Sequence, residues 1–269
     1  MKLDEIKRET VLELYAILRG KKFPKLDVVL HTPGGDADAT FLITKLLHAH
    51  SDHVAIIVPY YAKSAGTILC LGADELVVSE LSELGPLDVQ IREQQEGHGP
   101  KFTSALNGFK ALEQVQIHTI QTLDLATKMI LQRTGMRFSD ALHLAAEFAG
   151  QTSGTLYAQL DPKRIGEYAR ALGIGERYGI LILTRFMNWP LEKAKQTVLR
   201  LIQDYPSHDF VIDYSELLDL GLPAVLADPA VANVLEDACK AFFQHSGSKM
   251  KLYETPIATP SPGTGAVQP

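Results

Sequence analysis

The chain has few cysteines, no excess of positive charge and no long apolar segment. Its two cysteines, Cys70 and Cys239, lie among 269 residues, and both fall in apolar helical patterns. So few cysteines exclude a disulfide-rich secreted scaffold and favour two reduced core side chains. A net charge of −6 argues against the basic face that binding to phosphate groups needs, so no nucleic-acid partner is expected.

Several other signals are missing as well. No run of 18 apolar residues occurs, so no membrane span is expected. Residues 1–8 carry charges where a signal peptide needs an apolar core, which favours a cytoplasmic protein. No Gly-x-x-x-x-Gly-Lys loop is present to bind ATP. The histidines at positions 48, 50 and 53 lack a suitably spaced cysteine or carboxylate, so we expect neither a metal nor a cofactor.

The first third of the chain alternates between strand and helix patterns. Apolar, β-branched runs at 26–31, 53–58 and 75–78 enclose helical patterns at 37–50 and 65–73. Such an order predicts parallel strands joined by right-handed crossovers, and therefore an α/β fold. An amphipathic helix over residues 4–19 precedes this unit.

The second half of the chain is expected to be largely helical. A polar loop at 91–100 and an irregular stretch at 151–162 interrupt the pattern, and the Pro-, Thr- and Gly-rich tail should be disordered. We divide the chain into an N-terminal helix (1–25), one domain (26–250, with its helical portion at about 104–204) and a tail (251–269). The expected helices span about 104–133, 138–149, 163–187, 190–203, 215–220 and 229–245.

Ser64 is the most informative residue, because it lies where an apolar strand turns into a helix. A hydroxyl at such a turn is oriented for nucleophilic attack, but the same place also suits a simple N-cap serine. The Gly34-Gly35 pair ends the neighbouring strand, and the carboxyl ends of parallel strands meet at one edge of the sheet. Glycine N–H groups at such a turn can stabilise an oxyanion, which favours the nucleophile interpretation.

Four motifs at this edge resemble a known family. The motifs HTPGG (31–35), SAGT (64–67), LGADE (71–75) and LGPLD (84–88) are similar to those of the serine dehydrogenase proteinase family. That family belongs to the ClpP/crotonase superfamily and is close to the signal peptide peptidase A type of serine peptidase. The resemblance covers most of residues 26–225. It implies a ClpP/crotonase-like spiral of ββα units, assembly into a homo-oligomer, and peptide hydrolysis by a serine nucleophile.

The resemblance also assigns roles to individual residues. Ser64 would be the nucleophile, and the N–H groups of Gly35 and Ala65 would form the oxyanion hole. ClpP-type enzymes carry a histidine in the loop that corresponds to about 85–88, and none is present here. Enzymes of the signal peptide peptidase A type use a lysine before a long helix. Lys101 has that place, so a Ser64–Lys101 dyad is expected, provided that burial lowers the lysine pKa.

Other residues and other functions remain open from the sequence. His208 is the alternative base, because histidine titrates near neutral pH without strong tuning. Gly34, Tyr60 and Asp88 are expected to line the substrate site, and Asp88 could orient a base or cap a turn. The favoured substrate is a peptide or unfolded protein. The alternatives are a crotonase-like acyl-CoA enzyme and a non-catalytic assembly module on the same fold.

Overall fold

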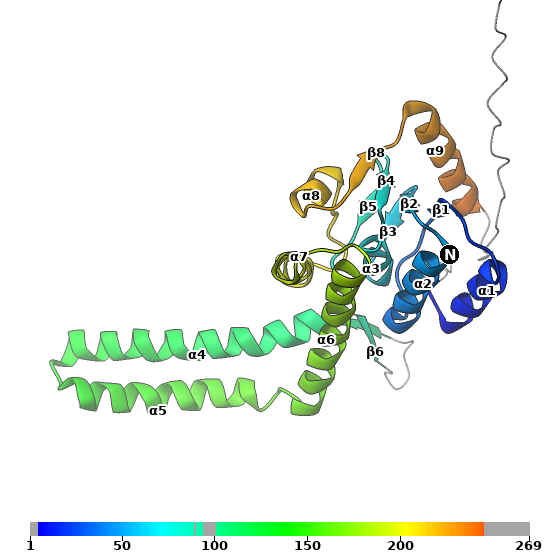
Figure 1. Ribbon diagram of the computed structural model, residues 1–269. Helices are drawn as coiled ribbons and strands as arrows, with labels where there is room; N and C mark the ends of the chain where they lie inside the picture. Colours follow the sequence, from blue (N-terminus) through cyan, green and yellow to red (C-terminus); the bar gives the residue numbers. More distant parts are fainter. Residues whose placement is uncertain (1–4, 89, 94–100, 245–269) are drawn as a thin grey trace, which may run out of the picture.

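A parallel sheet forms the centre of the protein in the computed structural model, which describes residues 5–88, 90–93 and 101–244 (Figure 1). Its strand order is β1-β2-β4-β8, from β1 (Leu26–Val29), β2 (Val54–Val58), β4 (Glu75–Val78) and β8 (Ala224–Leu226). All neighbours are parallel, and Ile56 at the centre lies opposite both Val28 and Leu76. The expected α/β class with parallel strands is therefore confirmed, although β8 gave no clear sequence signal.

A second, smaller sheet accompanies the first. Strands β3 (Tyr61–Ala62) and β5 (Glu83–Leu84) pair in parallel, and single bridges add Thr32 on one side and Ile212 on the other. The first two passes of the chain thus each contribute one strand to the large sheet and a short extended segment to the small one before a helix follows. This alternation is the ββα spiral that the sequence resemblance implied.

Helices cover the sheet and supply most of its apolar packing partners. Strand β2 is buried on both faces over most of its length, as parallel strands between helices usually are, whereas buried and partly buried residues alternate along β4. Helix α2 begins at the expected residue because the Asp36 carboxylate accepts a hydrogen bond from the N–H of Ala39. The helices around the sheet are α1 (Arg8–Leu18), α2 (Ala37–His50), α3 (Ala65–Cys70), α6 (Pro162–Arg185), α7 (Leu191–Gln203), α8 (Tyr214–Asp219) and α9 (Pro229–Gln244).

A long helical hairpin projects away from the sheet (Figure 1). It consists of α4 (Ala105–Thr134) and α5 (Phe138–Tyr157), which pack against each other along their lengths. Two sequence expectations are corrected in this region. Residues 151–157 continue α5 instead of being irregular, because alanines at 145 and 149 and Ser153 bury one continuous face. Residues 91–93 belong to β6 (Gln90–Glu93), which pairs with β7 (Lys101–Ser104) in an antiparallel ribbon.

Two further expectations concern the ends and the membrane. The expected disordered tail at 251–269 lies outside the described residues. Within the described ranges, no helix is both long enough and apolar enough to cross a bilayer.

Candidate active site

The glycine turn and Ser64 meet at one edge of the sheet, as the order of the strands predicts. A Cβ atom placed on Gly34 would lie 3.0 Å from the Cβ of Ser64 and 3.1 Å from the carbonyl oxygen of Lys63. The turn therefore packs directly on the backbone that carries Ser64. Gly34 also has a φ of +124°, which a residue with a side chain rarely adopts.

Ser64 adopts a strained backbone conformation between β3 and α3. Its φ is +49° and its ψ is −112°, so it lies in a region that non-glycine residues seldom occupy. It takes the N-cap position of α3, but its side chain makes no capping hydrogen bond. Strain of this kind costs on the order of 1–3 kcal/mol and is concentrated at functional sites. The conformation is the sharp strand-to-helix turn on which hydrolases present a nucleophilic serine.

The backbone N–H groups of Gly35 and Ala65 belong to residues that line one cavity together with Ser64. Gly35 belongs to the neighbouring turn, and Ala65 is the first residue of α3. Within the described part of the chain, neither N–H group donates a hydrogen bond. Unpaired backbone donors near a nucleophile are the groups that form an oxyanion hole.

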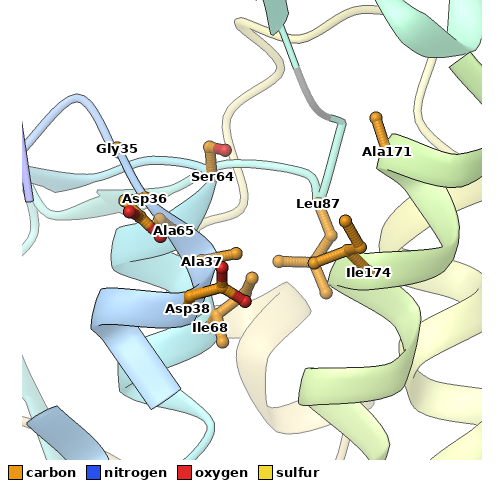
Figure 2. A pocket seen from close by; sticks show the side chains of 10 residues that line it. All are labelled: Gly35, Asp36, Ala37, Asp38, Ser64, Ala65, Ile68, Leu87, Ala171 and Ile174. Carbon is orange, nitrogen blue, oxygen red and sulfur yellow. The ribbon is translucent and has the colours of Figure 1, made fainter. Parts of the chain in front are cut away.

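A cavity of about 210 Å³ opens beside these groups (Figure 2). One wall comes from the glycine turn and α2, including the carboxylate-bearing Asp36 and Asp38, and the opposite wall is apolar. The lining residues are Gly35, Asp36, Ala37, Asp38, Ser64, Ala65, Ile68, Leu87, Ala171 and Ile174. The apolar wall from α6 was not foreseen, since nothing in the sequence relates residues 171–174 to Ser64.

Thr67 and Lys63 connect the serine turn to the loop at 84–88. The Thr67 hydroxyl lies 2.9 Å from the carbonyl oxygen of Ala62 and 2.7 Å from that of Gly85, and it accepts a hydrogen bond from the Gly85 N–H. The Lys63 ammonium donates to the carbonyl of Phe210 at 3.3 Å and pairs with the Glu83 carboxylate at 3.1 Å. The Lys63 side chain is thus a structural tie between three segments.

Asp88 and His208, which are 120 residues apart in the chain, face each other next to this tie. The Oδ2 atom of Asp88 lies 3.9 Å from Nδ1 of His208. Asp88 is 2% exposed, and its Oδ1 accepts a hydrogen bond from the Leu106 N–H. The Nδ1 atom of His208 is buried and has no hydrogen-bond partner among the described residues. A buried imidazole nitrogen near a buried carboxylate can serve as an acid–base pair, because catalytic contacts are often long without substrate and shorten in its complex.

Chain neighbours of this pair line the cavity beside Ser64 or bond to the residue before it. Leu87, which precedes Asp88, lines the cavity beside Ser64. Phe210, two residues after His208, accepts the hydrogen bond from Lys63, the residue before Ser64. The sequence alone could name Asp88 and His208 separately but gave no sign that they are partners.

Four other residues are expected at the site from the sequence: Lys101, Gly34, Tyr60 and Asp88. Lys101 begins β7, and its side chain lies outside the described residues. Tyr60 packs its ring 5.2 Å from that of Tyr61, measured between centroids. In the described chain, the cavity lining does not include Gly34, Tyr60 or Asp88.

The three histidines at 48, 50 and 53 do not converge. His48 Nε2 lies 2.8 Å from the carbonyl oxygen of Gly72, and His50 Nδ1 lies 2.8 Å from that of Lys21. Over the described ranges, no group of three or more His, Cys, Asp and Glu side chains is arranged to hold a metal ion.

A known protein family matches the part of the chain that contains this site. The family model described as "ClpP-like SDH-type serine proteinase" matches residues 6–142. The matched stretch contains the glycine turn, Ser64 and Asp88 and ends within α5, before His208.

Similar proteins and similar solved structures were also found. Two uncharacterized proteins of Methanocaldococcus jannaschii are similar: one is 35% identical over 119 residues (44% of this chain, 40% of the relative), the other 24% identical over 232 residues (86% and 62%). The chain thus spans less than two thirds of the length of either relative. Among solved structures, a mutant of the 1510-N membrane-bound stomatin-specific protease shares 16% identity at a TM-score of 0.46, covering 86% of this chain and 79% of that one. A mutant of ClpP1 from Listeria monocytogenes shares 12% identity at 0.41, covering 85% and 90%.

Proposed function

Because this chain belongs to the ClpP-like SDH-type serine proteinase family, we propose that it hydrolyses peptide bonds of peptides or unfolded proteins, with Ser64 as the nucleophile. The Ser64 Oγ atom attacks the scissile carbonyl carbon while a base takes the hydroxyl proton. The protonated base then gives this proton to the departing amine, and water hydrolyses the acyl-enzyme by the same route. The observation that carries the proposal is the strained Ser64 turn in contact with the Gly34-Gly35 turn.

The oxyanion of the tetrahedral intermediate is stabilised by the N–H groups of Gly35 and Ala65. Both residues line the cavity with Ser64, and both donors lack a partner in the described chain. Such fixed donors act on the transition state rather than on the bound substrate, because the negative charge develops only there.

We propose His208 as the base and Asp88 as the residue that orients it, because the Asp88 carboxylate lies 3.9 Å from the buried Nδ1 atom of His208. A carboxylate that accepts from Nδ1–H fixes the tautomer in which Nε2 can take the serine proton, and it stabilises the imidazolium that forms. This assignment replaces the Ser64–Lys101 dyad as our preferred mechanism. Lys101 remains the competing base, and the two are separated by mutation in the Discussion.

The experiment that tests the function is hydrolysis of casein, an unstructured protein, by the full chain. We expect fluorescent peptides to be released from labelled casein, and a fluorophosphonate to stop their release. Absence of hydrolysis together with absence of fluorophosphonate labelling would contradict the proposal.

Substitution of Gly35 is expected to reduce casein hydrolysis by about 10²–10³-fold, the usual cost of losing one oxyanion donor. In Gly35→Ala, the new Cβ atom would lie 2.3 Å from the Ile6 carbonyl oxygen, and the φ of +140° would be strained. The turn must therefore shift and carry its N–H away from Ser64. The measurements are the rate of casein hydrolysis and the melting temperature of the variant.

The matched control is Gly20→Ala. Gly20 also has a positive φ, +75°, but a Cβ there meets nothing within 4 Å. It reproduces the backbone strain without the displacement, so its casein rate should equal that of the parent. A parental rate in folded Gly35→Ala would argue against Gly35 as an oxyanion donor.

We also propose that the α4–α5 hairpin makes contacts between copies of the chain. Leu125 is 60% exposed and Phe148 is 53% exposed, although both are large apolar side chains. The hairpin carries four basic and four acidic residues, so its net charge is zero, whereas that of the whole chain is −6. Two hairpins can therefore approach each other without net charge repulsion. The charged positions are Lys110, Lys128, Arg133, Arg137, Glu113, Asp124, Asp140 and Glu147.

The double variant Leu125→Lys/Phe148→Lys is expected to sediment as a smaller species than the parent at the same concentration. Charges on both helices would make burial of this surface unfavourable. The control is Gln121→Lys/Gln151→Lys, which adds the same charge at exposed polar positions of the same helices. A parent chain that sediments as a monomer at all concentrations would contradict the assembly.

A further inference from the structure

The chain segment before α1 pairs with the glycine turn by backbone hydrogen bonds. The Ile6 N–H donates to the Gly34 carbonyl at 2.8 Å, and the Asp36 N–H donates to the Ile6 carbonyl at 2.8 Å. Together they make a parallel bridge between Ile6 and Gly35. This pairing joins the N-terminal segment to the turn that carries the proposed oxyanion donor.

The pairing fixes the direction of the Gly35 N–H. In a parallel bridge, one residue bonds to the two neighbours of its partner, and the partner's own N–H and C=O face the opposite edge. Ile6 occupies the edge made by the Gly34 carbonyl and the Asp36 N–H. The Gly35 N–H therefore faces the other edge, where Ser64 and Ala65 line the cavity with it.

The two backbones approach so closely that no side chain fits between them. A Cβ atom on Gly35 would lie 2.3 Å from the oxygen and 2.5 Å from the nitrogen of Ile6. Glycine at this position is thus required by contact with Ile6 as well as by its φ.

Side chains on both sides of the bridge hold it in place. The Ile6 side chain is 6% exposed and belongs to the main core. Arg8 lies 3.1 Å from the Asp38 carboxylate and 3.6 Å from that of Asp36. On α6, Tyr178 donates its hydroxyl hydrogen bond to Asp38, and this bond raises the tyrosine pKa. The segment is therefore tied to the start of α2, directly after the glycine turn.

We propose that residues 5–8 are a positioning element of the active site, in which the backbone of Ile6 holds the Gly35 N–H toward the oxyanion. The proposal rests on the proposed function, because it assigns a cause to the orientation of one of its two donors. It requires that loss of the Ile6–Gly35 pairing lower kcat and leave KM nearly unchanged, since the oxyanion exists only after attack. If the segment merely stabilised the fold, loss of the pairing would lower the melting temperature without lowering kcat selectively.

The test compares Ile6→Pro with Ile6→Ala, using kcat and KM for a fluorogenic peptide. Proline removes the N–H that donates to Gly34, whereas alanine keeps both backbone hydrogen bonds and removes only buried side-chain atoms. We expect kcat to fall by about 10–100-fold in Ile6→Pro, less than full loss of a donor, with KM within about twofold. In Ile6→Ala, kcat should stay close to that of the parent despite a lower melting temperature.

Several results would overturn the proposal. A parental kcat in folded Ile6→Pro, or an equal loss of kcat in Ile6→Ala, would overturn it. If Ile6→Pro does not fold, Arg8→Ala decides: it should lower kcat by about threefold, while Lys25→Ala, which removes a similar exposed ion pair with Glu75, should not. Equal kcat in these two variants would also overturn the proposal. A parent that fluorophosphonate fails to label would instead contradict the proposed function itself.

Discussion

Replacement of Ser64 by alanine is expected to lower casein hydrolysis by about 10⁴–10⁶-fold, as loss of a serine nucleophile does in other hydrolases. Alanine keeps the size of the residue and the strain of the φ of +49°, so the turn itself should persist. Only the hydroxyl group is lost. Because the Ser64 side chain makes no capping hydrogen bond, its removal takes no such bond from α3. The melting temperature of Ser64→Ala should therefore stay near that of the parent.

This combination separates a nucleophile from a helix cap. Loss of a capping hydrogen bond would cost about 1 kcal/mol of stability and leave hydrolysis intact. Ser139→Ala, at an exposed position of α5, is the control for a serine-to-alanine change with no expected effect on either quantity. If Ser64→Ala hydrolysed casein at the parent rate, Ser64 would have only a structural role.

The second large effect is expected at the Asp88–His208 pair. His208→Ala should reduce casein hydrolysis by about 10³–10⁶-fold, and Asp88→Asn by about 10⁴-fold, because an amide favours the wrong tautomer of the imidazole. Asparagine keeps an oxygen for the hydrogen bond from the Leu106 N–H, so the fold should tolerate this change. Because the two residues act as a unit, the double variant should be no slower than His208→Ala alone.

Lys101→Ala is the decisive comparison for the base. If His208 takes the serine proton, Lys101→Ala should hydrolyse casein within about threefold of the parent rate, since Lys101 then has no part in the proton transfer. Loss of hydrolysis in Lys101→Ala with a parental rate in His208→Ala would reverse the assignment. It would support the Ser64–Lys101 dyad that the sequence resemblance favoured.

Much of the fold could be predicted because local patterns and parallel topology agree in the first third of the chain. Helix α2 and strand β4 have the expected boundaries, and the parallel order brought Gly34 and Ser64 to one edge. The two-residue strands β3 and β5 could not be predicted, since two residues show no periodicity. Helix α5 runs through Gly150, where the cost of about 1 kcal/mol for a helical glycine is outweighed by packing against α4.

The site was only partly accessible from the sequence. The motifs around Gly35 and Ser64 are local, so their positions and types were readable. The contact between Asp88 and His208, and that between Ile6 and Gly35, join segments far apart in the chain without any local signal. The positive φ of Ser64 was hidden too, because serine is not a residue that marks such a conformation.

The most direct test of the account is fluorophosphonate labelling of the full chain, with the labelled residue located by peptide mass spectrometry. The account predicts a single phosphonylated residue, Ser64, in the parent and no labelling of Ser64→Ala under the same conditions. Labelling at another residue, equal labelling of both proteins, or an unlabelled parent would contradict it.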